Sequence, residues 1–144
     1  MKGIIEAKWN GKDDDDFEYA GSNYGSRVLA TWLVDESPGL YTAKDILRHA
    51  GKTDSIIYCG VGNAFGIYQY GLYVFLRVEY SDSEYHQVLL TVDQAVSLIK
   101  AFDALCASDV DDDTFEVEFI AAGKEARQKF EELASAEIGP PKGI

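Results

Sequence analysis

The sequence has few cysteines, few histidines and no long apolar run, and each shortage argues against a class of protein. Cys59 and Cys106 are the only cysteines in 144 residues, too few for a disulfide framework, and they form no CxxC pair. We expect both to be reduced, buried thiols of a cytoplasmic protein. No apolar stretch has the length of a signal region or a membrane span, so we expect neither secretion under its own signal nor a membrane partner.

Catalytic and metal-binding motifs are also missing. His49 and His86 are the only histidines, and neither belongs to an HxH or HExxH motif. No GxSxG segment marks a nucleophile, although Ser-His-Asp or Cys-His groups can also meet in space without a local motif. We therefore predict a protein that is not an enzyme and that holds no metal and no cofactor.

Two segments are partly similar to ligand-binding loops. Residues 60–66, GVGNAFG, have the spacing GxGxxxG and a strand-like continuation, so we favour a tight connection between strands over a nucleotide loop. The run DVDDDTFEVE begins at Asp109 and places Thr114 and Ile120 where a calcium-binding EF-hand requires glycine and glutamate. We therefore predict neither a nucleotide site nor a calcium site.

Basic residues are scarce relative to acidic ones. The chain has 13 lysines and arginines against 25 aspartates and glutamates, and its formal net charge is −12. A negative field repels phosphate backbones and anionic lipids and attracts cationic proteins, so direct nucleic-acid binding is not expected. Solubility, which acidic side chains promote, is the simplest alternative explanation of the charge. A hydrophobic content of 47% predicts a folded, globular chain despite this charge.

The clearest structural pattern begins at residue 72. Residues 72–80, LYVFLRVEY, alternate as in a strand with one buried face, and residues 85–92, YHQVLLTV, predict a second strand of an antiparallel hairpin. Thr91 and Gln94 have the spacing of a capping box, which begins a helix. Its predicted buried positions recur at helical spacing, and they are Ala95, Val96, Leu98, Ile99, Phe102 and Leu105.

The other predicted elements are shorter. A short helix is expected with Thr42 as its N-cap and with Gly51 stopping it. Residues 27–34, RVLATWLV, favour a strand buried on both faces, and a short helix that starts near Ser26 is the alternative. Four further strands and a final helix are predicted at residues 3–9, 55–59, 67–70, 114–120 and 124–134.

Together these elements predict an α+β fold. We expect one domain at residues 1–138, with two longer helices and one short helix packed on a mainly antiparallel sheet. Residues 139–144 contain Gly-Pro-Pro, which cannot continue a helix, and are expected to form a flexible tail.

Acidic residues gather in three intervals without lysine or arginine, namely residues 13–26, 78–99 and 101–123. A domain of this size has a radius of gyration of only ~15 Å, so two intervals on one side would form an anionic face for a basic protein. Nearby tyrosines would supply aromatic anchors. Solvated loop acids, with tyrosines that cap the core, are the alternative. The predicted partner contacts are Asp13, Asp14, Asp15, Asp16, Glu18, Tyr19, Tyr24, Asp82, Glu84, Tyr85, Asp111, Asp112, Asp113, Glu116 and Glu118.

The segment LTVDQAVSLIKAF, with the preceding strand, carries a resemblance to a known group of proteins. Its residues Thr91, Asp93, Ala95 and Phe102 resemble the strand-to-helix step of small α+β immunity proteins, which neutralise polymorphic or contact-dependent bacterial toxins. The resemblance covers about a quarter of the chain. It implies an inhibitor that acts by steric and electrostatic occlusion, and it transfers no binding residue.

We therefore predict a non-enzymatic acidic binding protein, an immunity protein or inhibitor that covers the basic active site of a toxin or of a nucleic-acid-binding protein. The alternative is a small-molecule-binding domain or minor enzyme with an aromatic pocket beside the glycine-rich segment 60–71. That pocket would be lined by Tyr68, Tyr70, Tyr73 and Phe75. A structural or self-associating protein is a third interpretation, which leaves the oligomeric state open.

Overall fold

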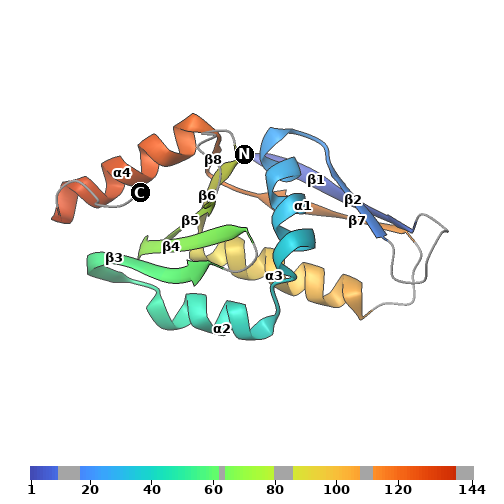
Figure 1. The fold of residues 1–144 in the computed structure, drawn as a ribbon, viewed down its shortest axis with the longest axis horizontal. Helices are drawn as coiled ribbons and strands as arrows, with labels where there is room; N and C mark the ends of the chain where they lie inside the picture. The colour runs from blue at the N-terminus through green and yellow to red at the C-terminus, as the bar shows by residue number, and fades with distance from the viewer. Residues whose placement is uncertain (10–16, 62–63, 80–85, 108–111, 139–144) are drawn as a thin grey trace.

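The computed structural model describes residues 1–9, 17–61, 64–79, 86–107 and 112–138. These residues form four helices and eight strands, and the strands make two antiparallel sheets (Figure 1). The α+β class predicted from the sequence is confirmed. The prediction of a flexible tail at 139–144 lies outside the described residues.

A three-stranded sheet has the order β2-β1-β7. Ile5 and Ala7 of β1 are fully buried, and the alternate residues Lys2 and Ile4 are exposed, as expected for a sheet with one covered face. The predicted first strand and the predicted acidic strand are confirmed as β1 and β7. The three strands are β1 at Lys2–Trp9, β2 at Phe17–Gly21 and β7 at Asp112–Glu118.

A five-stranded sheet has the order β3-β4-β5-β6-β8. The predicted antiparallel hairpin is confirmed as β5 and β6, in which Phe75 lies opposite Leu89. The strand β5 is the central one, so the hairpin has the predicted place. The five strands are β3 at Lys52–Val61, β4 at Phe65–Gly71, β5 at Tyr73–Val78, β6 at Gln87–Thr91 and β8 at Ala121–Ala122.

Helices cover both faces of the five-stranded sheet. On one face, Val74 and Leu76 belong to the larger core, to which α1, α2, α3 and the three-stranded sheet also contribute. On the other face, Phe75 stacks on Phe130 of α4 with ring centroids 5.2 Å apart. Figure 1 shows α4 on one side of this sheet and α2 on the other. The helices are α1 at Tyr24–Glu36, α2 at Leu40–His49, α3 at Val92–Cys106 and α4 at Lys124–Ile138.

The chain passes from one sheet to the other directly after β7. The Phe119 amide donates to the Met1 carbonyl at 3.0 Å, and the Met1 amino group donates to the Phe119 carbonyl at 2.7 Å. The next residue, Ile120, donates to the carbonyl of Leu89 in β6 at 2.8 Å. The two sheets are therefore joined by continuous backbone pairing.

The prediction of a strand at residues 27–34 is wrong, because these residues form the middle of α1. A capping box begins this helix: the Ser26 amide donates to Oδ1 of Asn23 at 3.0 Å, and the Asn23 amide donates to Oγ of Ser26 at 2.9 Å. The apolar run hid the helical period, since this helix is covered on most sides. Its largest buried side chains still recur at helical spacing, and they are Val28, Leu29, Trp32 and Leu33.

The start of α2 also differs from the prediction. Gly39 is the N-cap, and Thr42 lies within the first turn, where its Oγ1 accepts the Gly39 amide at 3.3 Å. The short helix ends at His49, and Gly51 follows with φ +84°, a left-handed conformation that glycine adopts without strain. The predicted stop at Gly51 is therefore confirmed, and the predicted cap is wrong.

The start of α3 follows the prediction closely. The Gln94 amide donates to Oγ1 of Thr91 at 3.0 Å, and the Thr91 amide donates to Oε1 of Gln94 at 2.9 Å. All six positions predicted to be buried in this helix are buried. Local signals in the sequence, the capping box and the apolar spacing, therefore predict this strand-to-helix step.

Candidate functional site

The predicted partner contacts divide into those that the structure describes and those that it does not. The described ones lie on β2, at the start of α1 and on β7, and they are Glu18, Tyr19, Tyr24, Asp112, Asp113, Glu116 and Glu118. The predictions for the others lie outside the described residues, and these are Asp13, Asp14, Asp15, Asp16, Asp82, Glu84, Tyr85 and Asp111.

Strand residues from the acidic intervals 13–26 and 101–123 lie close together on either side of β1. Lys8 of β1 pairs with Glu18 of β2 on one side and with Asp112 of β7 on the other. The residues that border segments 10–16 and 108–111 on these strands therefore meet at one end of the three-stranded sheet. From that end, the outward positions of β7 continue through Thr114 and Glu116 to Glu118.

Acidic side chains from β7 and α3 line a groove between these two elements. We call it the β7–α3 groove; its volume is about 330 Å³. Its acids come from two different base-free intervals, because Asp93 belongs to residues 78–99 and the two glutamates to residues 101–123. The groove is lined by Asp93, Gln94, Ser97, Leu98, Glu116, Val117 and Glu118.

The local sequence explains why carboxylates rim this groove. In β7, Val117 turns inward and is 3% exposed, so Glu116 and Glu118 on either side of it turn outward. On α3, Asp93 occupies the first helical turn, where the positive end of the helix dipole favours a negative charge. Leu98 is buried with Val117, and the groove therefore has an apolar floor and an acidic rim.

One basic side chain contacts this rim. Nζ of Lys2 lies 3.6 Å from Oε1 of Glu118, and the two side chains are 71% and 55% exposed. An exposed ion pair at this distance is weak, because water and salt screen both charges. The rim therefore keeps a negative field, and Asp93 and Glu116 contribute to it directly.

The acidic interval 78–99, which supplies Asp93 to the groove, has a different environment at its start. Oε1 of Glu79 accepts a hydrogen bond from the Tyr68 hydroxyl at 2.8 Å, and Oε2 lies 3.1 Å from Nη2 of Arg77. The guanidinium of Arg77 also lies 5.4 Å from the centre of the Tyr68 ring. Glu79 is thus neutralised within the five-stranded sheet and adds nothing to the β7–α3 groove.

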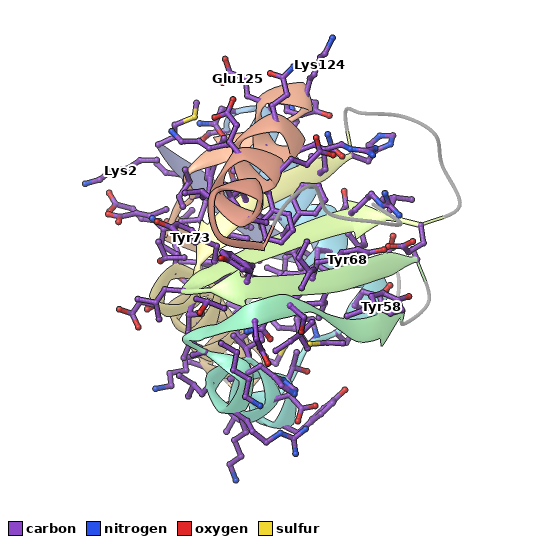
Figure 2. All side chains as sticks on the ribbon, turned by 90° about the vertical axis from the view of Figure 1, so that its left-hand side faces the viewer. Lys2, Tyr58, Tyr68, Tyr73, Lys124 and Glu125 are labelled. Atoms are coloured by element: carbon purple, nitrogen blue, oxygen red, sulfur yellow. The ribbon has the colours of Figure 1, made fainter. Side chains whose placement is uncertain are left out.

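The surroundings of Tyr68 and Arg77 in this cluster shift the pKa values of these two side chains. Burial, and after it the hydrogen bond to Glu79, raises the pKa of Tyr68 to about 12. Burial alone would lower the pKa of Arg77, but Glu79 and Tyr68 raise it above its ordinary value. The Tyr58 ring lies tilted beside the Tyr68 ring, with centroids 4.9 Å apart. Figure 2 shows the two side chains on neighbouring strands. The hydroxyl of Tyr68 therefore keeps its proton and the guanidinium of Arg77 keeps its charge, which suits a structural role.

Two tyrosines predicted as partner anchors pack against the core. The Tyr19 ring lies 5.9 Å from the ring of Phe102, and burial, followed by the charge of Cys106, raises the pKa of Tyr19. Tyr24 is also partly buried against the larger core. Both side chains are half-buried, and their role as anchors stays a prediction.

The aromatic residues proposed for a small-molecule pocket share the face of the five-stranded sheet that α4 covers, and two of them line a hollow there. Tyr68, Tyr70 and Phe75 are buried in the smaller core and Tyr73 packs against it, while Tyr70 and Tyr73 also line a wide depression of about 740 Å³. Tyr68 and Tyr73 lie on the same face of the sheet, and Figure 2 shows Tyr73 to the left of Tyr68 along it. We call this hollow the α4 depression; the rest of its lining is Gly51, Thr53, Gly71, Leu72, Lys129, Glu132 and Leu133.

Cys59 and His49 lie close together, but their geometry opposes thiolate chemistry. Sγ of Cys59 lies 3.9 Å from Nδ1 of His49, and the same Nδ1 lies 2.9 Å from the Asp45 backbone carbonyl. A carbonyl only accepts, so Nδ1 carries a proton there and cannot also take one from the thiol. Instead, the thiol donates to Oε1 of Gln69 at 3.4 Å. Burial, and after it the Asp45 carboxylate, raises the pKa of Cys59 and disfavours a nucleophilic thiolate.

Both cysteines are free and exposed, so the prediction that they are buried is wrong. Cys59 lies on β3, the edge strand of the five-stranded sheet, and Cys106 is the last residue of α3. Apolar neighbours in the sequence suggest burial, but an edge strand and a helix end leave these two side chains open to solvent. Burial of part of each side chain still raises the pKa of both thiols.

A small cavity of about 200 Å³ lies beside Cys59, and the carboxylate at its edge has a structural task. Oε1 of Glu36 accepts the backbone amides of Ala64 at 2.5 Å and Phe65 at 2.9 Å. Glu36 thereby ties the end of α1 to the start of β4. This carboxylate is therefore committed to the fold rather than to chemistry in the cavity.

Metal-binding and membrane-spanning features were sought across the described part of the chain. There, no group of three or more His, Cys, Asp or Glu side chains is arranged to hold a metal ion. Likewise, no helix in residues 1–9, 17–61, 64–79, 86–107 or 112–138 combines the length and apolar character needed to cross a bilayer.

Comparison with family models, curated proteins and solved structures finds no match for this chain.

Sequence reasoning missed one side of the β7–α3 groove. Asp93 was counted among the acids but was not predicted as a contact, and Gln94 was interpreted only as a capping residue. The available signal was the position of Asp93 in an exposed first turn. No local pattern, however, shows that this turn lies beside Glu116 and Glu118.

Proposed function

We propose that the protein is a non-enzymatic inhibitor of the immunity-protein type, which covers the basic site of a toxin or of another nucleic-acid-binding protein. The observation that carries this proposal is the β7–α3 groove, where carboxylates from two separate acidic intervals rim one hollow. A cleft that binds a phosphate backbone is positively charged, and an anionic groove complements it.

The distribution of charge supports the same partner class. Glu116 and Glu118 occupy successive outward positions of β7, and a formal net charge of −12 reinforces their negative field. Such a field accelerates encounter with a cationic protein by ~10–1000-fold at low salt. The proposed mechanism is occlusion, in which the partner's basic groups are paired and its nucleic-acid substrate is excluded.

A second candidate function is small-molecule binding in the α4 depression. Its volume of about 740 Å³ lies within the range of ~300–1,000 Å³ that is typical of ligand sites. Two opposite charges, Lys129 and Glu132, accompany Tyr70 and Tyr73 there. The acidic groove is favoured, because its two rims come from separate intervals and share one sign of charge.

The test uses the product of the reading frame adjacent to the gene as the partner. Its association rate with this protein is measured by stopped-flow fluorescence from 50 to 500 mM salt, concentrations at which screening changes from weak to strong. We expect the association rate to fall by about 10-fold or more over this range and nuclease or toxin activity to be blocked at a 1:1 ratio. An association rate that does not respond to salt contradicts the proposal.

A further inference from the structure

The strand β7 is the edge of the three-stranded sheet, and the pairing at its end shows which of its backbone groups are open. Met1 and Phe119 exchange two hydrogen bonds, at 2.7 and 3.0 Å. In an antiparallel ladder the residues that bond the neighbour alternate with residues that point away. The register therefore gives the inner bonds to Val117 and Phe115, opposite Gly3 and Ile5.

The pairing on the other side of β1 supports this assignment. The Ser22 amide donates to the carbonyl of Ile4 at 2.9 Å, and the Ile4 amide donates to Oγ of Ser22 at 2.8 Å. Ile4 thus bonds toward β2, and its neighbours Gly3 and Ile5 bond toward β7. Consequently Thr114, Glu116 and Glu118 turn their amides and carbonyls to the other edge of β7, with which no strand of the described chain pairs.

This edge borders the β7–α3 groove. The backbone of Glu116 and Glu118 carries the open hydrogen-bonding groups, and the first turns of α3 form the opposite wall. Neighbouring strands lie ~4.8 Å apart, so a strand added to β7 would enter a space walled by Gln94 and Ser97. A groove between an edge strand and a helix can accept a peptide by strand addition, as other peptide-binding domains do.

We propose that the β7–α3 groove binds an extended basic segment of the partner, which pairs with β7 as an added strand. This inference rests on the proposed function and specifies how the partner is held. Residues opposite Glu116 and Glu118 lie on the same face as these glutamates, so lysine or arginine at every second position meets the acidic rim. The alternate residues face Val117 and Leu98, and small apolar side chains fit there.

Edge strands also carry charges simply to prevent aggregation, so the experiment must separate pairing from charge alone. The probe is the acetylated, amidated peptide Lys-Val-Lys-Thr-Lys-Val-Lys, labelled with a fluorophore and titrated with the full chain by anisotropy. Two further peptides carry N-methyl groups, one on the lysine amides and one on the valine and threonine amides. In a strand, only one of these two sets of amides can bond β7.

The expected result is that one methylated peptide binds about 10-fold more weakly than the parent, while the other keeps at least a third of the parent's affinity. Equal binding of the parent and both methylated peptides overturns strand addition. No binding of the parent peptide overturns it as well. If either peptide result overturns strand addition, a partner association rate that responds to salt still leaves the proposed function standing. A salt-independent association rate contradicts that function whatever the peptides do.

A pair of protein variants tests the same edge without changing the peptide. Glu116→Pro removes the charge and the open amide, while Glu116→Gln removes only the charge. Proline is tolerated on an edge strand when its nitrogen faces outward, so the ladder to β1 is retained. We expect Glu116→Pro to bind the parent peptide about 10-fold more weakly than Glu116→Gln, and equal binding overturns the proposal. If circular dichroism shows that the proline variant does not fold, the methylated peptides decide.

Discussion

The hydroxyl of Tyr68 donates a hydrogen bond of 2.8 Å to Oε1 of Glu79. Burial disfavours the ionised phenol, and this contact does so as well because an ionised phenol cannot donate; together they raise the pKa of Tyr68 to about 12. In the unfolded chain the same phenol ionises near pH 10. The stabilisation is therefore fully present below pH ~10 and is lost as the pH rises through about 12.

The first prediction follows from that contact. Glu79→Gln removes the carboxylate and should move the pKa of Tyr68 down from about 12 toward its ordinary value. Phenolate absorbance is titrated in this variant and in the parent, and Tyr68→Phe identifies the signal of this one tyrosine. In thermal unfolding, the loss of stability above pH ~10 should shrink in Tyr68→Phe and remain in Tyr41→Phe, whose ring is 71% exposed. An unchanged Tyr68 titration in Glu79→Gln contradicts this assignment.

The second prediction concerns the cap of α1. Oδ1 of Asn23 accepts the Ser26 amide, and its Nδ2 donates to the Lys2 carbonyl at 2.7 Å. Asn23→Ala removes both contacts and should lower the free energy of unfolding by about 1–2 kcal/mol in urea titrations. Asn23→Asp keeps the capping oxygen and loses only the donor, so it should be affected less. Equal losses in the two variants would show that the cap contributes little.

The third prediction tests where the charge acts. Glu116→Lys places a positive charge on the rim of the β7–α3 groove, and Asp54→Lys makes the same change in net charge on β3, the far edge of the other sheet. We expect the association rate with the basic partner to be about three-fold lower in Glu116→Lys than in Asp54→Lys. Both rates are measured by stopped-flow fluorescence at low salt. Equal rates in the two variants would mean that net charge alone, and not the groove, steers the partner.

The fourth prediction concerns the exposed thiol of Cys59. Burial and the Asp45 carboxylate raise its pKa, whereas Arg48, which lies 2.8 Å from Asp45, lowers it. Asp45→Asn should therefore lower the pKa of Cys59 and increase its rate of alkylation by iodoacetamide at neutral pH by about three-fold. Cys106 in the same sample is the internal control, since its raised pKa comes from burial and Asp103. Mass spectrometry quantifies both sites, and a parallel increase at Cys106 would indicate a general loosening of the fold.

Elements with strong local signals could be predicted from the sequence. The start of α3 depends on a side-chain contact between Thr91 and Gln94, three residues apart, and the hairpin of β5 and β6 depends on alternation. The helix α1 was misread because its apolar residues suggested burial without indicating a period. Its capping box at Asn23 and Ser26 was the better signal.

The groove could be predicted only in part. Glu116 and Glu118 were identified because they alternate with buried residues in one strand. Asp93 lies on a different element, and its position beside β7 depends on how α3 packs against the three-stranded sheet. Such long-range packing leaves no trace in local spacing, and the same holds for the pairing of His49 with Cys59.

The alternation along β7 separates two kinds of information within a single strand. Phe115 and Val117 hold the sheet to the core, while Thr114, Glu116 and Glu118 face outward and take no part in core packing. The residues proposed to contact a partner and the residues that hold the fold therefore alternate along one strand. Under the proposed function, the outward residues can be exchanged one at a time, and partner specificity can change while the core packing beneath them stays the same.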